Sequence, residues 1–370
     1  MALFDENVTV VPAPRRRRSR GTQVGLWALV VALVTLLALT FLPTSYVIEQ
    51  PGPVYNTLGT VQTSDGETVP LIEVAGAPTY ETSGALDLLT VQVAGSPERR
   101  PSWFELAMAW FDPSRAIVPI ESVFPSGVTS EERSEVNAAL MVDSQAEATA
   151  AALTELGYDV GTAETVYSVG EGSAADGVLV AGDVIVAVGG QDVADVQQIR
   201  DLVQDADGAA VAIDILRDGT PMTVSLTPAF DSESDAWLIG VTLTTEYDFP
   251  VDVTIQLDNV GGPSAGMMFA LGIMDVMTPD QLNGGAEVAG TGTITADGVV
   301  GAIGGIRQKL WGALNAGAEY FLAPDSNCDE VAGNVPGDLQ VFAVATLDDA
   351  LAALDAIRTD ADLSALPTCG

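Results

Sequence analysis

Gly261-Gly262-Pro263-Ser264-Ala265-Gly266 precedes an apolar run, residues 267–277, which has the length of a helix and ends at a Thr-Pro-Asp turn. We therefore expect Ser264 at or just before a helix N-terminus. There the backbone N–H groups of Ser264, Ala265 or Gly266 could hold an oxyanion, and the helix dipole favours developing negative charge. The alternative is a Gly-Pro-Ser turn that only caps a buried helix.

A second stretch supplies a base for this serine. The sequence contains no histidine, and Lys309 is its one lysine. A Ser-His-Asp triad is therefore excluded, and a desolvated lysine amine is the usual substitute. Residues 287–310 read E-V-A-G-T-G-T-I-T-A-D-G-V-V-G-A-I-G-G-I-R-Q-K-L, which indicates two short strands leading through Gly304-Gly305 into a helix. Lys309 falls in the first turn of that helix, where the dipole and burial both lower an amine pKa from about 10.4 toward neutrality.

Three motifs together resemble the proteolytic domain of the Lon protease family. They are G-P-S-A-G at 262–266, T-G-x-I-x-x-x-G-x-V-x-x-I-G-G-I-x-x-K at 291–309, and A-G-A-x-x-F-L-A-P at 316–324. The resemblance implies that Ser264 is the nucleophile, that Lys309 is its general base and that Thr291 helps to hold the lysine. Gly261 stands where Lon proteases with an ATPase usually have an acid, so we assign no acidic third member. The predicted domain covers 237–358 and is followed by a tail, 359–370.

Two other lysine-dependent motifs are excluded by the same single lysine. A nucleotide-binding G-K-[ST] loop needs a hydroxyl after the lysine, where this chain has Leu310, and an S-x-x-K dyad needs a serine where it has Ile306. We therefore expect peptide hydrolysis that is independent of ATP, with no cofactor and no metal. The alternatives are a catalytically silent peptide-binding scaffold and an enzyme that cuts only itself or one partner. The resemblance to Lon proteases also implies that copies of the chain assemble into a homo-oligomeric ring.

Residues 157–230 are similar to a bacterial PDZ domain of the kind attached to HtrA-like proteases. The motifs are G-S-x-A at 172–175 and G-D-V-I-x-x-V-x-G at 182–190, with Ala174 where that family usually has proline. Such a domain binds an extended peptide as an added strand, while backbone N–H groups of a loop take its carboxylate. We expect Leu156-Gly157-Tyr158 at that loop. A rigid spacer or gate is the alternative role for the domain.

The N-terminal part predicts a membrane anchor. A basic tail, 1–23, with Arg15 to Arg18 precedes an uncharged apolar run, 24–42, which as a helix would span ~28 Å, close to the hydrocarbon core of a bilayer. The positive-inside rule leaves the N-terminus in the cytoplasm and the remainder outside. A cleaved signal peptide is the alternative, but the run is long and no small-x-small site follows it.

Between the anchor and the PDZ domain, residues 43–156 predict a strand-rich region that ends in a helix. Within it, Ser102 to Phe111 is aromatic and mostly apolar. We interpret this segment as a short helix packed on the domain. The alternative is a platform at the membrane surface or beside the substrate entrance. The whole chain is thus predicted to be a multi-domain α/β (α+β) protein with one transmembrane helix.

Composition limits the ligands and the compartment. The 370 residues carry a formal net charge of −37, and nine basic residues face forty-nine acidic ones after Pro43. Such a surface repels nucleic acid and anionic lipid headgroups, so we expect no nucleic-acid partner. Cys328 and Cys369 both fall in the part expected outside the cytoplasm, where a disulfide is permitted. Two free buried thiols are the alternative, and zinc is disfavoured because two thiolates without histidine are too few ligands.

Overall fold

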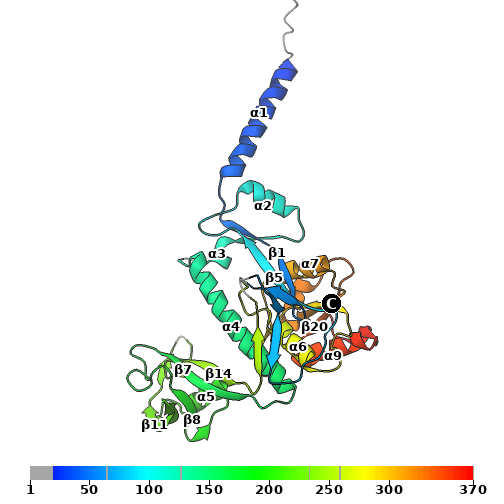
Figure 1. The fold of residues 1–370 in the computed structure, drawn as a ribbon. Helices are drawn as coiled ribbons and strands as arrows, with labels where there is room; N and C mark the ends of the chain where they lie inside the picture. The colour runs from blue at the N-terminus through cyan, green and yellow to red at the C-terminus, as the bar shows by residue number, and fades with distance from the viewer. Residues whose placement is uncertain (1–19, 64–65, 126, 233, 258–259, 370) are drawn as a thin grey trace, which may run out of the picture. The chain divides into compact units, whose positions relative to one another are not determined.

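The computed structural model describes residues 20–63, 66–125, 127–232, 234–257 and 260–369 (Figure 1). Most of the predicted basic tail, including Arg15 to Arg18, lies outside these residues. The chain divides into two compact units, one formed by 1–50 with 93–130 and the other by 51–92 with 131–370. Strands β1 (Tyr46–Asn56) and β5 (Ala85–Ala94) pass from one unit into the other.

The first unit begins with the apolar helix α1 (Arg20–Phe41). Of the helices that the structure describes, α1 alone is long and apolar enough to cross a membrane, over Gln23–Phe41, and none of that span is buried. Helix length and composition are also compatible with a signal sequence. The start of β1 pairs antiparallel with β6 (Ala116–Pro119). Two short helices complete the unit: α2 (Trp103–Trp110) and α3 (Ile120–Val123).

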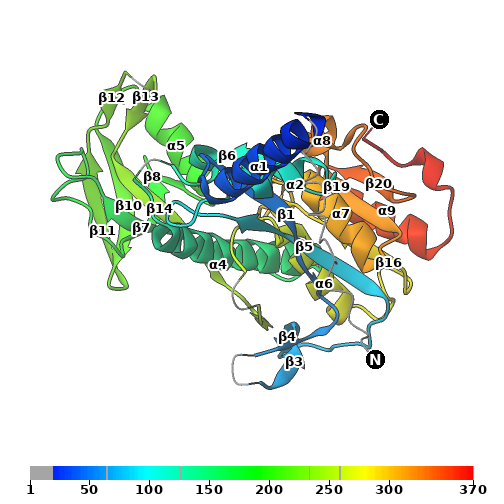
Figure 2. The same cartoon turned by 90° about the horizontal axis from the view of Figure 1, so that it is seen from above.

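The second unit is built on parallel strands in the order β20-β19-β16-β5, where β16 is Glu287–Gly290, β19 is Tyr320–Pro324 and β20 is Gln340–Val344. Each neighbouring pair is parallel (Figure 2). Parallel strands are normally covered on both faces, and successive side chains point to opposite faces. The strands obey this rule, since Leu322 and Phe342 join one apolar cluster and Phe321 and Val341 join another.

Two sets of helices cover these two faces. The first cluster contains side chains of α6 (Gly266–Met277) and α9 (Leu347–Arg358), and the second contains side chains of α7 (Ile306–Ala316). The sheet therefore separates the helix after Ser264 from the helix that carries Lys309. The long helix α4 (Ser130–Glu155) adds side chains to the first cluster. The other elements of this part are short: β2 (Thr60–Gln62), β3 (Thr68–Pro70), β4 (Ile72–Ala75), β15 (Asp252–Ile255), β17 (Thr293–Ile294), β18 (Val300–Gly301), η1 (Asp325–Asn327), α8 (Cys328–Val331) and η2 (Leu363–Ala365).

Residues 161–248 form a separate antiparallel sheet with its own core. Its strand order is β11-β10-β8-β7-β14, and β9 pairs with β8. The elements are β7 (Gly161–Val169), β8 (Val184–Val188), β9 (Gln191–Asp192), α5 (Val196–Asp205), β10 (Val211–Arg217), β11 (Thr220–Leu226), β12 (Ala229–Asp231), β13 (Ala236–Leu238) and β14 (Val241–Asp248). At the end of this order, β14 pairs with β7 over its whole length and is an edge strand among the described residues.

A partly buried ion pair holds the loop between β7 and β8. The Asp183 carboxylate is inaccessible to solvent and accepts two hydrogen bonds from Arg217, each 2.7 Å long. It also accepts from the backbone N–H of Val180 at 2.9 Å. Arg217 lowers the pKa of this carboxyl group. Asp183 is thus a structural residue of the loop.

Candidate active site

The loop before α6 presents Ser264. Helix α6 starts at Gly266, and its side chains are almost all buried, so the apolar run after the serine fixes this end of the helix in the core. Two contacts with α4 (Ser130–Glu155) hold the loop from the other side. Gly262 N–H donates to the Asn137 carbonyl at 2.8 Å, and the Ser144 hydroxyl donates to the Pro263 carbonyl at 3.0 Å. Ser264 itself is half-buried.

Lys309 lies in the first turn of α7, as its sequence position predicts. The turn before the helix needs Gly305, which adopts a left-handed conformation at φ 68° and caps the helix. The apolar face of α7 then directs Lys309 inward, where only 2% of the residue is exposed. Its Nζ atom lies 2.8 Å from the Ser264 Oγ atom.

Thr291 completes a hydrogen-bonded set of three side chains. It is buried at the end of β16, and its Oγ1 atom accepts a hydrogen bond from Lys309 Nζ at 2.8 Å. The Thr291 hydroxyl in turn donates to the Ser264 carbonyl at 2.9 Å. Gly292 N–H donates to the same carbonyl at 3.0 Å. The threonine therefore fixes both the position of the amine and the backbone of the serine.

Burial determines the charge state of this site. Desolvation lowers the pKa of Lys309 from 10.5 to about 7. No carboxylate among the described residues forms a salt bridge with the lysine, so nothing in this part of the chain offsets the cost of burying its charge. A neutral amine has two N–H groups and one lone pair. With one N–H directed to Thr291, the lone pair can accept the Ser264 proton.

The three predicted oxyanion donors differ in their hydrogen bonding. Gly266 N–H donates to the Pro263 carbonyl at 3.3 Å, which closes the turn before α6. The N–H groups of Ser264 and Ala265 make no hydrogen bond to another described residue. Both stand at the N-terminal end of α6, where the helix dipole favours an anion. Ser264 and Ala265 are thus better placed than Gly266 to bind an oxyanion.

Leu156-Gly157-Tyr158, the predicted carboxylate loop, forms the C-terminal cap of α4. Gly157 has φ 81°, and its N–H and that of Tyr158 donate to carbonyls of the last turn. The side chains of Leu156 and Tyr158 pack against the larger apolar cluster around α6. These residues lead into β7, whose first residue, Gly161, pairs with Asp248 at the C-terminal end of β14, so they do not precede the start of that edge strand. The residues that precede β14 are instead Leu238, Ile239 and Gly240.

The two cysteines and Arg307 lie outside the three-residue site. Cys328 and Cys369 are bonded to each other, with an S–S distance of 2.08 Å. Arg307 is exposed and forms no salt bridge with a described residue. Among the described residues, no group of three or more Cys, Asp or Glu side chains is arranged to hold a metal ion.

Sequence motifs did not reveal the residues that support the site from a distance. Asn137 and Ser144 reach the serine loop from α4, far earlier in the chain. Asn327 makes two hydrogen bonds to the backbone of Ile303, just before α7, at 2.9 and 3.0 Å. These contacts depend on tertiary packing, and no local pattern in the sequence marks them.

Comparison with known proteins identifies both folded parts. Residues 238–356 match the Lon protease (S16) C-terminal proteolytic domain, and residues 165–217 match a PDZ domain. The chain is 36% identical to a Lon protease of Azospirillum brasilense over 123 residues, which is 32% of this chain and 15% of the relative. It is 32% identical to a Lon protease of Campylobacter concisus over 145 residues, or 38% and 17% of the two chains. The chain thus spans less than a fifth of these relatives.

Isolated PDZ domains are among the solved structures that resemble part of this chain. The PDZ domain of an SdrC-like protein from Listeria innocua is 28% identical, with 22% of this chain and 92% of that chain covered and a TM-score of 0.21. The family matches confirm the two resemblances expected from the sequence motifs, and they agree with the mixed helix-and-strand architecture. The chain therefore carries a PDZ domain followed by the C-terminal proteolytic domain of the Lon (S16) protease family.

Proposed function

We propose that the protein is a serine endopeptidase that uses a Ser264–Lys309 dyad without ATP. The observation that carries this proposal is the 2.8 Å hydrogen bond between Lys309 Nζ and Ser264 Oγ in a site that lowers the lysine pKa to about 7. A general base with a pKa near the working pH is the most effective one. The match to the Lon proteolytic domain supports the same reaction class.

The proposed reaction begins when neutral Lys309 takes the Ser264 proton as Oγ attacks a peptide carbonyl. The N–H groups of Ser264 and Ala265 stabilise the oxyanion, and the lysine ammonium then protonates the leaving amine. Water, deprotonated by Lys309, hydrolyses the acyl-enzyme and regenerates the serine. Thr291 holds the amine throughout, because it binds both Nζ and the Ser264 backbone.

The substrate proposal follows from the absence of a nucleotide-binding motif in the sequence. We expect the enzyme to cut unstructured segments of exported or membrane proteins, because such segments need no motor to unfold them. We further propose that α1 anchors the chain in the cell membrane with its N-terminus in the cytoplasm. The ring-shaped homo-oligomer implied by the family resemblance also belongs to this proposal.

For the PDZ domain we propose peptide binding at the edge strand β14. A peptide that adds to a free sheet edge gains backbone hydrogen bonds. The loop before β14 contains Gly240 at φ 78°, and the N–H groups of Ile239 and Gly240 make no hydrogen bond to a described residue. These features support a carboxylate site at residues 239–240 rather than at 156–158.

The decisive experiment uses the full chain in detergent with fluorescently labelled casein as an unfolded substrate. Cleavage without ATP should rise with pH through about 7, and S264A and K309R should abolish it. The matched control is R307Q, which removes an exposed charge two positions from the lysine and should cleave like the wild type. Equal cleavage by S264A and wild type would refute the dyad, and an inactive wild type would favour the scaffold role.

Peptide binding is measured separately on the S264A variant, so that the peptide is not cut. Fluorescence anisotropy should show tighter binding of a peptide with a free C-terminal carboxylate than of the same peptide with a C-terminal amide. Equal affinity for the two peptides would contradict the carboxylate site, and it would leave the protease proposal unchanged.

A further inference from the structure

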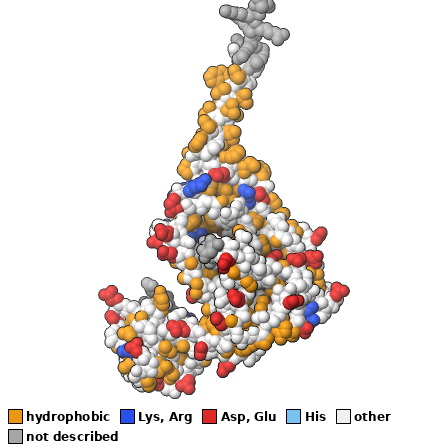
Figure 3. Space-filling view, viewed as in Figure 1, with side chains coloured by type: hydrophobic (Ala, Val, Ile, Leu, Met, Phe, Trp, Pro, Cys, Tyr) orange, Lys and Arg blue, Asp and Glu red, His pale blue; other side chains and the backbone are white. Residues whose placement is uncertain are grey.

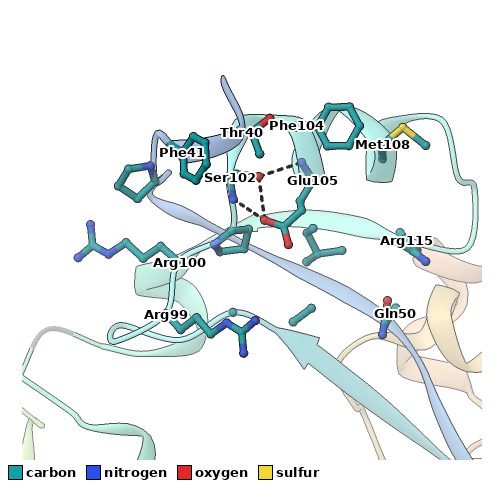
Figure 4. A pocket seen from close by; sticks show the side chains of 15 residues that line it. Thr40, Phe41, Gln50, Arg99, Arg100, Ser102, Phe104, Glu105, Met108 and Arg115 are labelled. Atoms are coloured by element: carbon teal, nitrogen blue, oxygen red, sulfur yellow. Dashed lines mark hydrogen bonds between the residues drawn. The ribbon is translucent and has the colours of Figure 1, made fainter. Parts of the chain in front are cut away.

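A pocket of about 590 Å³ lies in the first unit, beside the end of α1 (Figure 4). The last residues of α1, Thr40 and Phe41, line it together with side chains of α2 and the loops on either side of that helix. Three arginines also line the pocket: Arg99, Arg100 and Arg115. They are three of only eight arginines after Pro43, in a sequence that is otherwise strongly acidic.

Two of these arginines form no salt bridge within the described part of the chain, although the charge of Arg99, after the hydrogen bonds from Ser102, is one of the causes that lower the pKa of Glu105. Arg115 pairs with Asp112 at 3.0 Å, whereas Arg99 and Arg100 form no salt bridge with a described residue. The one acid that lines the pocket is Glu105, and its carboxylate accepts two hydrogen bonds from Ser102, at 2.7 and 2.8 Å. The pocket thus combines an excess of positive charge with free guanidinium donors, which favours an anion.

Helix α2 exposes an apolar face next to this pocket. Its inward residues, Leu106 and Ala109, pack against Ile48. The outward residues are large and apolar, with Trp110 78% and Phe111 83% exposed. Figure 3 shows apolar surface running from α1 onto this region, with basic side chains beside it. Such a face is characteristic of helices that lie in a membrane interface, where tryptophan is enriched.

The connection between α1 and α2 fixes how far the pocket can lie from a bilayer. Pro43, two residues after the end of α1, pairs with Ser102, the N-cap of α2. Thr44 adds two hydrogen bonds to the Pro101 carbonyl, both 3.0 Å long. An extended chain spans at most about 3.6 Å per residue, and paired antiparallel residues lie about 5.5 Å apart, so the start of α2 lies within roughly 13 Å of the end of α1. A spanning α1 would therefore hold the pocket at headgroup level.

We propose that α2 and this pocket form a docking site for the outer surface of the bilayer, in which Arg99 and Arg100 bind the phosphate of an anionic phospholipid while Arg115, paired with Asp112, lies on the other side of the pocket (Figure 4). The aromatic residues of α2 enter the interface, and the arginines offset the repulsion between the acidic domain and an anionic membrane. This inference rests on the proposed anchoring by α1. It goes beyond anchoring because it assigns a lipid-binding role to residues outside the membrane span.

The test uses the full chain reconstituted in vesicles whose phosphatidylcholine is brominated near the ester end of its acyl chains. Bromine quenches nearby tryptophan, so W103F/W110F should lose a large part of the quenching seen in the wild type. Adding phosphatidylglycerol should increase the α2-dependent quenching. R99Q/R100Q should weaken docking by roughly fivefold for each arginine removed. The matched control, R200Q, removes an arginine of α5 that does not line the pocket and should behave like the wild type.

Failure of the anchor and failure of the docking site give different results. Trp27 lies in α1, so quenching that W27F reduces shows that α1 is in the bilayer. If W27F reduces quenching while W103F/W110F does not, the anchor stands and the docking proposal is wrong. If inorganic phosphate, added to vesicles of phosphatidylcholine alone, raises the α2-dependent quenching as much as phosphatidylglycerol does, the pocket is a site for soluble anions, and the lipid assignment is overturned.

Discussion

At the scale of single residues, Thr291 tests the idea that the dyad depends on a third side chain. T291V keeps the shape of the side chain but removes the acceptor for Lys309 and the donor to the Ser264 carbonyl. Leaving buried polar groups unpaired costs roughly 1–3 kcal/mol, so kcat should fall about tenfold to a hundredfold while KM changes little. Steady-state kinetics measure both constants.

T291S is the matched control for this prediction, because it retains the hydroxyl and loses only a methyl group. It should recover most of the activity that T291V loses. If T291V and T291S were equally impaired, packing of the methyl group would explain the defect, and Thr291 would have no positioning role through its oxygen.

Lys309 also makes a prediction about stability. Its pKa is about 7 in the folded protein and about 10.4 when unfolded. Below pH 7 the Lys309 amine is protonated in both the folded and the unfolded protein. Folding then buries a charged amine, which lowers the free energy of unfolding by the full amount. Between pH 7 and pH 10.4 the lysine is protonated only in the unfolded state, so the free energy of unfolding rises with pH. K309M should therefore stabilise the protein below pH 7, by on the order of 4 kcal/mol, and by almost nothing near pH 10.

Urea unfolding of the full chain in detergent, at pH 6 and pH 10, measures this difference. R307M is the control, because it replaces an exposed basic residue two positions from Lys309. A K309M effect that does not change with pH would mean that the lysine titrates normally, and the proposed general base would lose its physical basis.

At the scale of elements, the turn before α7 is the connection on which the lysine position depends. Gly305 has φ 68°, and an added Cβ atom would lie 2.7 Å from a methyl group of Val91. G305A should therefore destabilise the protein by roughly 1–3 kcal/mol and reduce activity, because α7 must shift. Thermal unfolding and casein cleavage measure the two effects.

The neighbouring glycine provides the matched control. An added Cβ atom at Gly304 meets no atom within 4 Å, and its φ is not in the left-handed region. G304A should therefore leave stability nearly unchanged. Equal effects of G304A and G305A would show that flexibility of the turn, rather than the left-handed conformation of Gly305, is what matters.

The sequence predicted the helices and the turn that carry the site residues, but not the tertiary contacts that hold them in place. The helix after Ser264 and the Gly-Gly turn before Lys309 follow from local patterns, so both could be expected from residues 259–317. The contacts of Ser144 and Asn327 join segments that are distant in the chain, and only folding brings them together. The predicted carboxylate loop at 156–158 is a second example. Gly157 ends a helix, as glycine often does, whereas the edge position of β14 depends on the order of strands in the sheet, which no local motif encodes.

At the scale of the whole molecule, the disulfide closes the last part of the chain onto the proteolytic domain. Cys328 and Cys369 are 41 residues apart, and Cys369 packs in the cluster beneath α7. A loop of this length predicts a loss of about 4 kcal/mol when the bond is removed. C369S should therefore lower the thermal unfolding midpoint. A reductant should lower that of the wild type by a similar amount and leave C328S/C369S unchanged.

Average charge proved a poor guide to local surface chemistry. The sequence carries a net charge of −37, which indicates repulsion of anionic headgroups. Yet three arginines line one pocket beside the end of α1. In the sequence, the whole of α2 lies between Arg100 and Arg115. Composition cannot report such a cluster, because the fold decides which of the few basic residues become neighbours.

The single buried lysine has a consequence for chemical labelling. Apart from the N-terminal amine, Lys309 carries the only primary amine of the chain, and 2% of it is exposed. Any enzyme that attaches a protein tag to lysine would therefore find no acceptor side chain on the folded surface. Reductive methylation with carbon-13 formaldehyde would give one side-chain resonance, whose chemical shift reports the protonation of the active site directly as the pH is changed.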